Sequence, residues 1–227
     1  MGGHLHGELA ASLAIETFIE SFGHHAQPRI ADPDKFISDT MRYAHERIIR
    51  LPHDMSMGGF PGTTCVAVLV QDGRMYLGHA GDSRLYLLRD GAVIARTRDH
   101  SIVQRWFDLG MITEEQARTH PQRNQITNCL GGAGDAFRME RGEPVLLQPG
   151  DVVLLGSDGL WGAFSDQELV ESFISRPVHD VLAGLIEHAL LRMDGHSDNA
   201  TGLAVRWGGG ETAHNTDEPV CHVLDIP

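Results

Sequence analysis

Two consecutive β-hairpins are predicted by residues 64–96, which read TCVAVLVQDGRMYLGHAGDSRLYLLRDGAVIAR. The apolar run at 64–70 suits a strand buried on both faces, and Asp72-Gly73 separates it from the next run. Asp90-Gly91 separates a second pair of runs in the same way. An Asp-Gly pair between apolar runs is a strong hairpin signal, because both turn positions take positive φ. The region is therefore predicted to form antiparallel sheet.

Helices are predicted before these hairpins. Residues 8–22 place apolar side chains at helical spacing, so one face of that helix is apolar. These side chains are Leu9, Leu13, Ile15, Ile19 and Phe22. A second helix is expected to begin near Asp32-Pro33, an N-cap followed by proline in the first turn. Its buried face is expected to comprise Phe36, Met41, Ala44 and Ile48.

The second half of the chain alternates helical and strand patterns. Helical residues 101–119 are expected to break at Gly110. Thr113-x-x-Gln116 and Ser165-x-x-Glu168 predict capping boxes, and the second of them opens a further helix. Further predicted elements are strand-like residues 137–147, strands at 152–156 and 201–207, and a helix at 178–192. We expect one domain at residues 1–207 and a poorly ordered tail at residues 208–227.

Composition excludes several classes of protein. The net charge of −13 argues against general nucleic-acid binding, which needs a basic face. No window approaches about 18 consecutive apolar residues, so no membrane span is expected, and the N-terminus lacks the pattern of a signal peptide. The three cysteines form no Cys-x-x-Cys pair. The chain is therefore predicted to be soluble and cytoplasmic.

Three aspartates occupy the ends of predicted strands. Asp82 follows a strand and Gly81, Asp158 follows the apolar strand at 152–156, and Asp198 precedes the final strand. Carboxylate oxygens are hard ligands suited to Mg²⁺ or Mn²⁺. A single aspartate beside glycine is usually a turn residue, so the local motifs decide between these interpretations.

The motifs occur in a specific order. They are Met1-Gly2-Gly3-His4, Gly62-Thr63-Thr64, Gly81-Asp82-Ser83-Arg84, Asp99-His100-Ser101, Ser157-Asp158-Gly159-Leu160-Trp161 and Asp198-Asn199-Ala200-Thr201. This series resembles the metal-dependent protein phosphatases of type 2C, the PPM family, in its bacterial branch. The likeness covers about residues 1–207. Each motif is weak alone, but the whole series in order is specific.

The resemblance implies a fold, an activity and a set of site residues. The fold would be α+β, a four-layer α-β-β-α sandwich of two antiparallel sheets flanked by helices. The activity would be hydrolysis of phosphoserine and phosphothreonine by a metal-activated water. Asp158 and Asp198 would ligate a pair of Mn²⁺ or Mg²⁺ ions, and Asp82, with Asp158, would serve a third ion. His4 is a candidate proton donor to the leaving oxygen. The implied substrates are phosphorylated proteins, targets of serine/threonine kinases, and the implied state is a monomer with no nucleic-acid or membrane partner.

The chain departs from the family pattern at its start. The family's first metal aspartate directly precedes the methionine that matches Met1, and the first strands lie further upstream. We therefore expect an N-terminally incomplete domain with exposed strand edges and reduced metal affinity. Two functions stay open on the sequence: a metal-dependent phosphatase, or a phosphatase-like module or fragment without catalysis. The upstream reading frame and titration with Mn²⁺ distinguish them.

Overall fold

The computed structural model describes residues 6–26, 28–55, 59–133, 137–192 and 199–208. The chain divides into two compact units. Unit 1 comprises Met1–Asp82 and Asp99–Leu146, and unit 2 comprises Ser83–Arg98 and Leu147–Pro227. His4, Asp198 and tail residues 209–227 lie outside the described residues.

Unit 1 is built around the first predicted hairpin. Strands β2 (Cys65–Gln71) and β3 (Arg74–Ala80) pair antiparallel across Asp72-Gly73, whose φ angles are 54° and 71°. The short strands β7 (Glu140–Arg141) and β8 (Val145–Leu146) pair with β3. A separate ribbon joins β1 (Gly62–Thr63) to β6 (Leu130–Gly131). The expected hairpin is confirmed, while the strand pattern at 137–147 yields only these short pieces.

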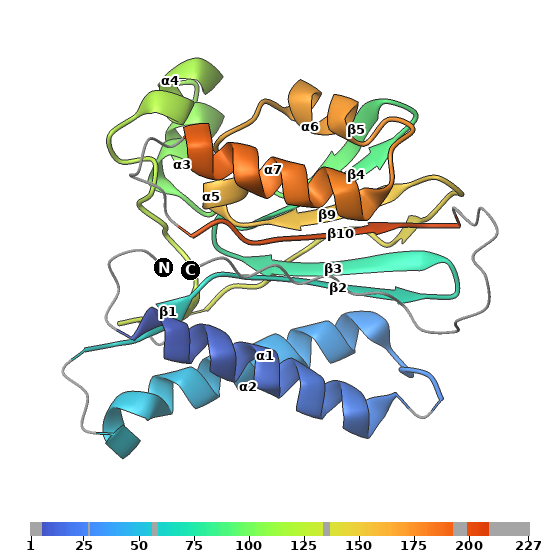
Figure 1. Ribbon diagram of the computed structural model, residues 1–227. Coiled ribbons are helices and arrows are strands. Elements are labelled where there is room, and N and C mark those ends of the chain that lie inside the picture. Colours follow the sequence, from blue (N-terminus) through green and yellow to red (C-terminus); the bar gives the residue numbers. More distant parts are fainter. Residues whose placement is uncertain (1–5, 27, 56–58, 134–136, 193–198, 209–227) are drawn as a thin grey trace. The chain divides into compact units, whose positions relative to one another are not determined.

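Helices α1 (Gly7–His25) and α2 (Pro33–Met55) lie side by side in unit 1 (Figure 1). Helix α2 buries the four side chains predicted for it, Phe36, Met41, Ala44 and Ile48. Helix α1 differs from the simple apolar-face pattern. Its buried positions include the small residues Ala10, Ala14 and Thr17, whereas Ile15 and Ile19 are 62% and 67% exposed. Small side chains let two helix backbones approach closely, so the packing against α2 selects that face.

The prediction that residues 64–70 are buried on both faces is wrong. The side chains of β2 are mostly half-buried, and Val70 is 39% exposed. The reason is topological, because among the described residues β2 pairs only with β3 and forms an edge of its sheet.

Two short helices of unit 1 lie in the chain between strand β1 and strand β6. Helix α3 (Ile102–Asp108) is capped by Ser101, whose Oγ accepts the N–H of Gln104. Helix α4 (Glu114–Thr119) opens with the predicted capping box of Thr113 and Gln116. Gly110 separates the helices with φ of 69°, which confirms the expected break.

Unit 2 contains a four-stranded antiparallel sheet in the order β10-β9-β4-β5. Its strands are β4 (Arg84–Arg89), β5 (Ala92–Arg96), β9 (Val152–Gly156) and β10 (Gly202–Arg206). Its helices are α5 (Asp158–Trp161), α6 (Asp166–Ser172) and α7 (Val178–Arg192). Helix α7 runs along the sheet (Figure 1) and buries Val181, Leu185 and Ile186 in a core shared with β9. None of the described helices combines the length and apolar character that a bilayer crossing requires.

Candidate active site

Asp82 lies at the end of β3, as the sequence predicted, and is 9% exposed. The preceding Gly81 has φ of 113°, a backbone conformation that residues other than glycine rarely adopt. A Cβ at this position would also overlap the side chain of Thr64. The turn that presents Asp82 therefore requires glycine at position 81.

His100 forms two hydrogen bonds with Gly81 in this turn. Its backbone N–H donates to the Gly81 carbonyl (2.9 Å), and its Nδ1 accepts the Gly81 N–H (3.1 Å). The same Nδ1 lies 2.8 Å from Nδ2 of Asn128. No local pattern in the sequence indicates these bonds from His100 to Gly81, which lies 19 positions earlier.

Asp158 follows β9 in unit 2 and is half-buried. Three strands meet in register at this edge, because Gly156 is the partner of both Arg84 in β4 and Gly202 in β10. Oδ1 of Asp158 accepts the N–H of Gly159 (2.9 Å). The carboxylate is thereby oriented by its own backbone at the end of a rigid strand.

Ser157 connects Asp158 to the loop that contains the third predicted aspartate. Its Oγ accepts the N–H of Thr201 (2.9 Å) and donates to the carbonyl of Asn199 (3.2 Å). Residues 199–201 are thus fixed directly beside the end of β9. Asp198 itself lies outside the described residues, so its predicted role stays a prediction, as does that of His4.

Arg84 contributes a fixed positive charge near this edge of unit 2. Its guanidinium carbon lies 3.4 Å from the centre of the Trp161 ring, which is a close cation–π contact. Its Nη1 donates to the Tyr86 hydroxyl (3.0 Å). Burial raises the pKa of Tyr86, although Arg84 acts in the opposite direction, so the hydroxyl stays neutral and can accept this bond.

A cluster of potential ligands in unit 1 needs separate consideration. His79, His100 and Glu140 each place one ligand atom within 4.8 Å of the others. However, Nδ1 of His100 faces the N–H of Gly81 and the amide of Asn128, so its ring proton lies on Nε2, which donates to Glu140 (3.0 Å). A metal-ligating histidine binds the ion through one ring nitrogen while the other donates its N–H. In His100 the Nδ1 lone pair already accepts two N–H donors and Nε2 carries the proton, so neither nitrogen is left to bind an ion. The rings of His79 and His100 are also stacked, with planes 20° apart, so their lone pairs do not converge. We interpret the cluster as a hydrogen-bonding network.

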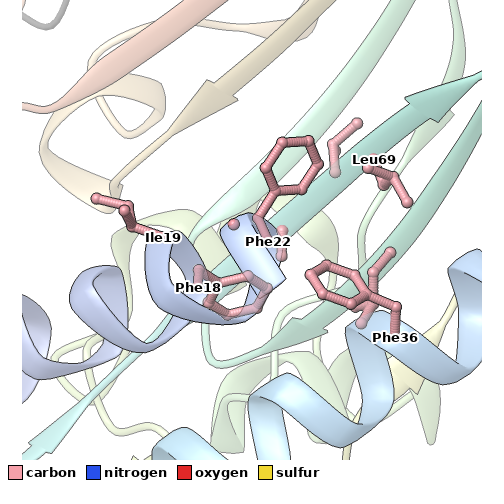
Figure 2. A pocket seen from close by; sticks show the side chains of 9 residues that line it. Phe18, Ile19, Phe22, Phe36 and Leu69 are labelled. Atoms are coloured by element: carbon pink, nitrogen blue, oxygen red, sulfur yellow. The ribbon is translucent and has the colours of Figure 1, made fainter. Parts of the chain in front are cut away.

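A separate cavity of about 490 Å³ lies within unit 1 between α1, α2 and β2. Figure 2 shows the rings of Phe18, Phe22 and Phe36 beside Leu69 of β2. Its lining residues are all apolar or glycine. It therefore offers no group that could bind a phosphate or a metal ion, and it is not the site of the chemistry.

Comparison with known proteins identifies the class. The family model for protein phosphatase 2C matches residues 15–105. A putative protein phosphatase 2C-type protein of Streptococcus pyogenes is 33% identical over 174 residues, which are 75% of this chain and 68% of that protein.

Solved structures that resemble this chain are also phosphatases. The serine/threonine phosphatase of S. agalactiae has a TM-score of 0.79 at 27% identity, covering 90% of this chain and 83% of its own. The catalytic domain of the serine/threonine phosphatase PstP, solved in complex with two manganese ions, has a TM-score of 0.75 at 32% identity. The match covers 90% of this chain and 83% of the PstP chain.

The chain belongs to the protein phosphatase 2C family. The predicted α+β class of antiparallel sheets with flanking helices is confirmed, as is the family named from the motifs. Asn128 and Glu140 lie outside the motifs, so no sequence signal indicated their contacts with His100.

Proposed function

We propose that this protein is a metal-dependent phosphatase that hydrolyses phosphoserine and phosphothreonine in proteins. The observation that carries the proposal is Asp158, whose carboxylate accepts the N–H of Gly159 at the end of a central strand. Relatives and structural neighbours of the chain are named serine/threonine phosphatases. Phosphorylated proteins are then its substrates. We further propose that these are targets of serine/threonine kinases and that the enzyme acts in the cytoplasm as a monomer.

The aspartates of each unit are suited, by their chemistry, to hard divalent cations. Asp82 is nearly buried and Asp158 half-buried, and carboxylate oxygens at such positions suit Mn²⁺ and Mg²⁺. We propose Asp158 and Asp198 as ligands of a metal pair and Asp82 as a ligand of a further ion. Bound cations would supply activation of a water molecule and neutralisation of phosphoryl charge. His4 is the proposed proton donor to the leaving oxygen.

The protein's own residues prepare this site before any cation binds. Gly159 orients the Asp158 carboxylate, and Ser157 fixes residues 199–201 beside it. Such rigid positioning of ligands supports metal affinity, because bonds from neighbouring groups restrict the ligands' movement.

The test is Mn²⁺-dependent hydrolysis of a phosphothreonine peptide by the chain and, in parallel, by the longest open reading frame that contains it. Asp158→Asn is expected to lower kcat/KM by at least about a hundredfold, because loss of a direct ligand should cost no less than loss of a group that only orients one. Asp166→Asn is the matched control, since Asp166 forms an exposed ion pair with Arg96 in the same unit. Full activity of the Asp158 variant would refute the proposed role. Absence of both hydrolysis and calorimetric Mn²⁺ binding in both proteins would favour a non-catalytic module.

A further inference from the structure

His100 has more bonding partners than a residue that only begins a helix requires. Its backbone N–H and its Nδ1 both bond to Gly81, its backbone carbonyl accepts the N–H of Thr127 (2.7 Å), and its Nε2 reaches Glu140. The side chain is only 14% exposed. One residue thus connects the Asp82 turn, the segment after α4 and strand β7, all within unit 1.

The neighbours of His100 specify a single tautomer. Oδ1 of Asn128 accepts the N–H of Arg138 (3.1 Å), and Nδ2 donates to the Arg138 carbonyl (2.6 Å), which fixes the orientation of the amide. Nδ2 therefore donates to Nδ1 of His100, as does the Gly81 N–H. With two donors at Nδ1, the proton of the neutral ring must reside on Nε2, where the Glu140 carboxylate accepts it. His79 stacks on the ring at 4.5 Å and fixes its plane.

We infer that His100 is a positioning residue for Asp82. Gly81 has positive φ, so its peptide groups lie in an unusual orientation that the two bonds to His100 stabilise. Because Asp82 is the next residue, the direction of its carboxylate depends on this orientation. The inference rests on the proposed function in one respect, the role of Asp82 as a metal ligand.

Two substitutions test the contacts of the two ring nitrogens of His100 separately. The amide oxygen of asparagine and Nδ1 of histidine are both bonded to Cγ, so His100→Asn keeps an acceptor for Gly81 and loses the bond to Glu140. His100→Gln places its amide one bond further out, keeps a donor for Glu140 and loses the acceptor for Gly81. A merely structural role would give similar results for both variants, whereas the positioning role predicts that only asparagine preserves the turn.

The first measurement needs neither metal nor activity. Hydrogen exchange of the Gly81 amide in the metal-free chain is expected to stay slow in wild type and His100→Asn, and to accelerate at least about tenfold in His100→Gln, which corresponds to the loss of one net hydrogen bond. Slow exchange in His100→Gln would overturn the inference. Thermal unfolding of both variants identifies any global loss of structure, and Glu140→Gln offers a milder variant because its side chain is 49% exposed.

The second measurement is the Mn²⁺ concentration that gives half-maximal hydrolysis, in the longest reading frame that contains the chain. It is expected to rise about tenfold in His100→Gln, the usual scale for loss of a group that orients a metal ligand, and to change little in His100→Asn. Asp82→Asn is measured alongside. An unchanged midpoint in Asp82→Asn would refute the metal role of Asp82 itself. A raised midpoint in Asp82→Asn with none in His100→Gln would refute the positioning role alone.

Discussion

Two glycine turns in unit 1 and two turns in unit 2 are stabilised by different acceptors. In unit 1, imidazoles accept from glycines of positive φ: Nδ1 of His45 accepts the N–H of Gly131 (3.0 Å), and Nδ1 of His100 accepts that of Gly81 (3.1 Å). In unit 2, oxygen atoms have this role, since Asp151 accepts the N–H of Gln148 (2.8 Å) and Ser157 that of Thr201 (2.9 Å).

The difference has an energetic consequence. A neutral imidazole needs no counter-charge, but a buried carboxylate is costly unless it is paired. Asp151 accordingly has a fully buried side chain that receives two bonds from Arg89, each 2.7 Å long. Unit 2 should therefore be sensitive to loss of charge, and unit 1 to the shape of its glycine turns.

The largest effect is expected from Asp151→Ala. The substitution removes the buried carboxylate that accepts from Arg89 and from the Gln148 N–H, and loss of one member of a buried ion pair should lower the free energy of unfolding by about 4 kcal/mol. Urea denaturation measures it. Asp166→Ala is the control, because its ion pair with Arg96 is exposed and should contribute about 0.5 kcal/mol. Equal losses of unfolding free energy in the two variants would show that the buried pair of Asp151 contributes no more stability than the exposed pair of Asp166.

The next effect is expected from Gly131→Ala in unit 1. Gly131 has φ of 71°, and a Cβ there would overlap the side chain of Ile48 and the carbonyl of Pro61. Left-handed strain and overpacking together should cost about 3 kcal/mol. Gly110→Ala isolates the strain, since Gly110 has φ of 69° with open space around its Cβ position, and should cost about 1 kcal/mol. Denaturation curves that coincide for the two variants would contradict the steric account.

A smaller effect should follow from changing His45. His45→Leu leaves the buried N–H of Gly131 without an acceptor and should cost about 2 kcal/mol. His45→Asn keeps an acceptor bonded to Cγ and should be less destabilising. Thermal unfolding compares them, and an asparagine variant no more stable than the leucine variant would argue that stacking on Phe137, rather than the hydrogen bond, is what matters.

The smallest effect concerns acid stability in unit 2. The backbone N–H of Ser165, with Arg192 and the Ser165 hydroxyl, lowers the pKa of Glu168 from 4.5 to about 2. Burial acts to raise the pKa of Asp151, but bonds from Arg89 and Gln148 lower it overall. A carboxyl group with a lowered pKa stabilises the fold above its unfolded pKa, and this contribution is lost as pH falls through the folded value.

The unfolding free energy should therefore decline from about pH 4.5 toward pH 2. Glu168→Gln should show a shallower decline, because glutamine does not titrate. Denaturation at a series of pH values in constant salt measures both slopes. Parallel slopes for wild type and variant would contradict the assignment of this decline to titration of Glu168.

Much of the fold was predictable because its signals are local. Asp72-Gly73 and Asp90-Gly91 form the expected turns, and both capping boxes are present, at Thr113 and at Ser165. Asp82 and Asp158 were placed at strand ends by the adjoining apolar runs, and the structure places them there. Their roles as ligands remain predictions.

The sequence by itself determined the turns, the helix starts and the family, because each depends on residues within a few positions or on motifs in a fixed order. Only the tertiary structure decided which face of α1 is buried, the half-buried state of β2, and the network around His100. The physical reason is sequence separation: Gly131 meets His45 across 86 positions, and His100 meets Glu140 across 40. Such bonds depend on how helices and strands pack, which no local pattern encodes.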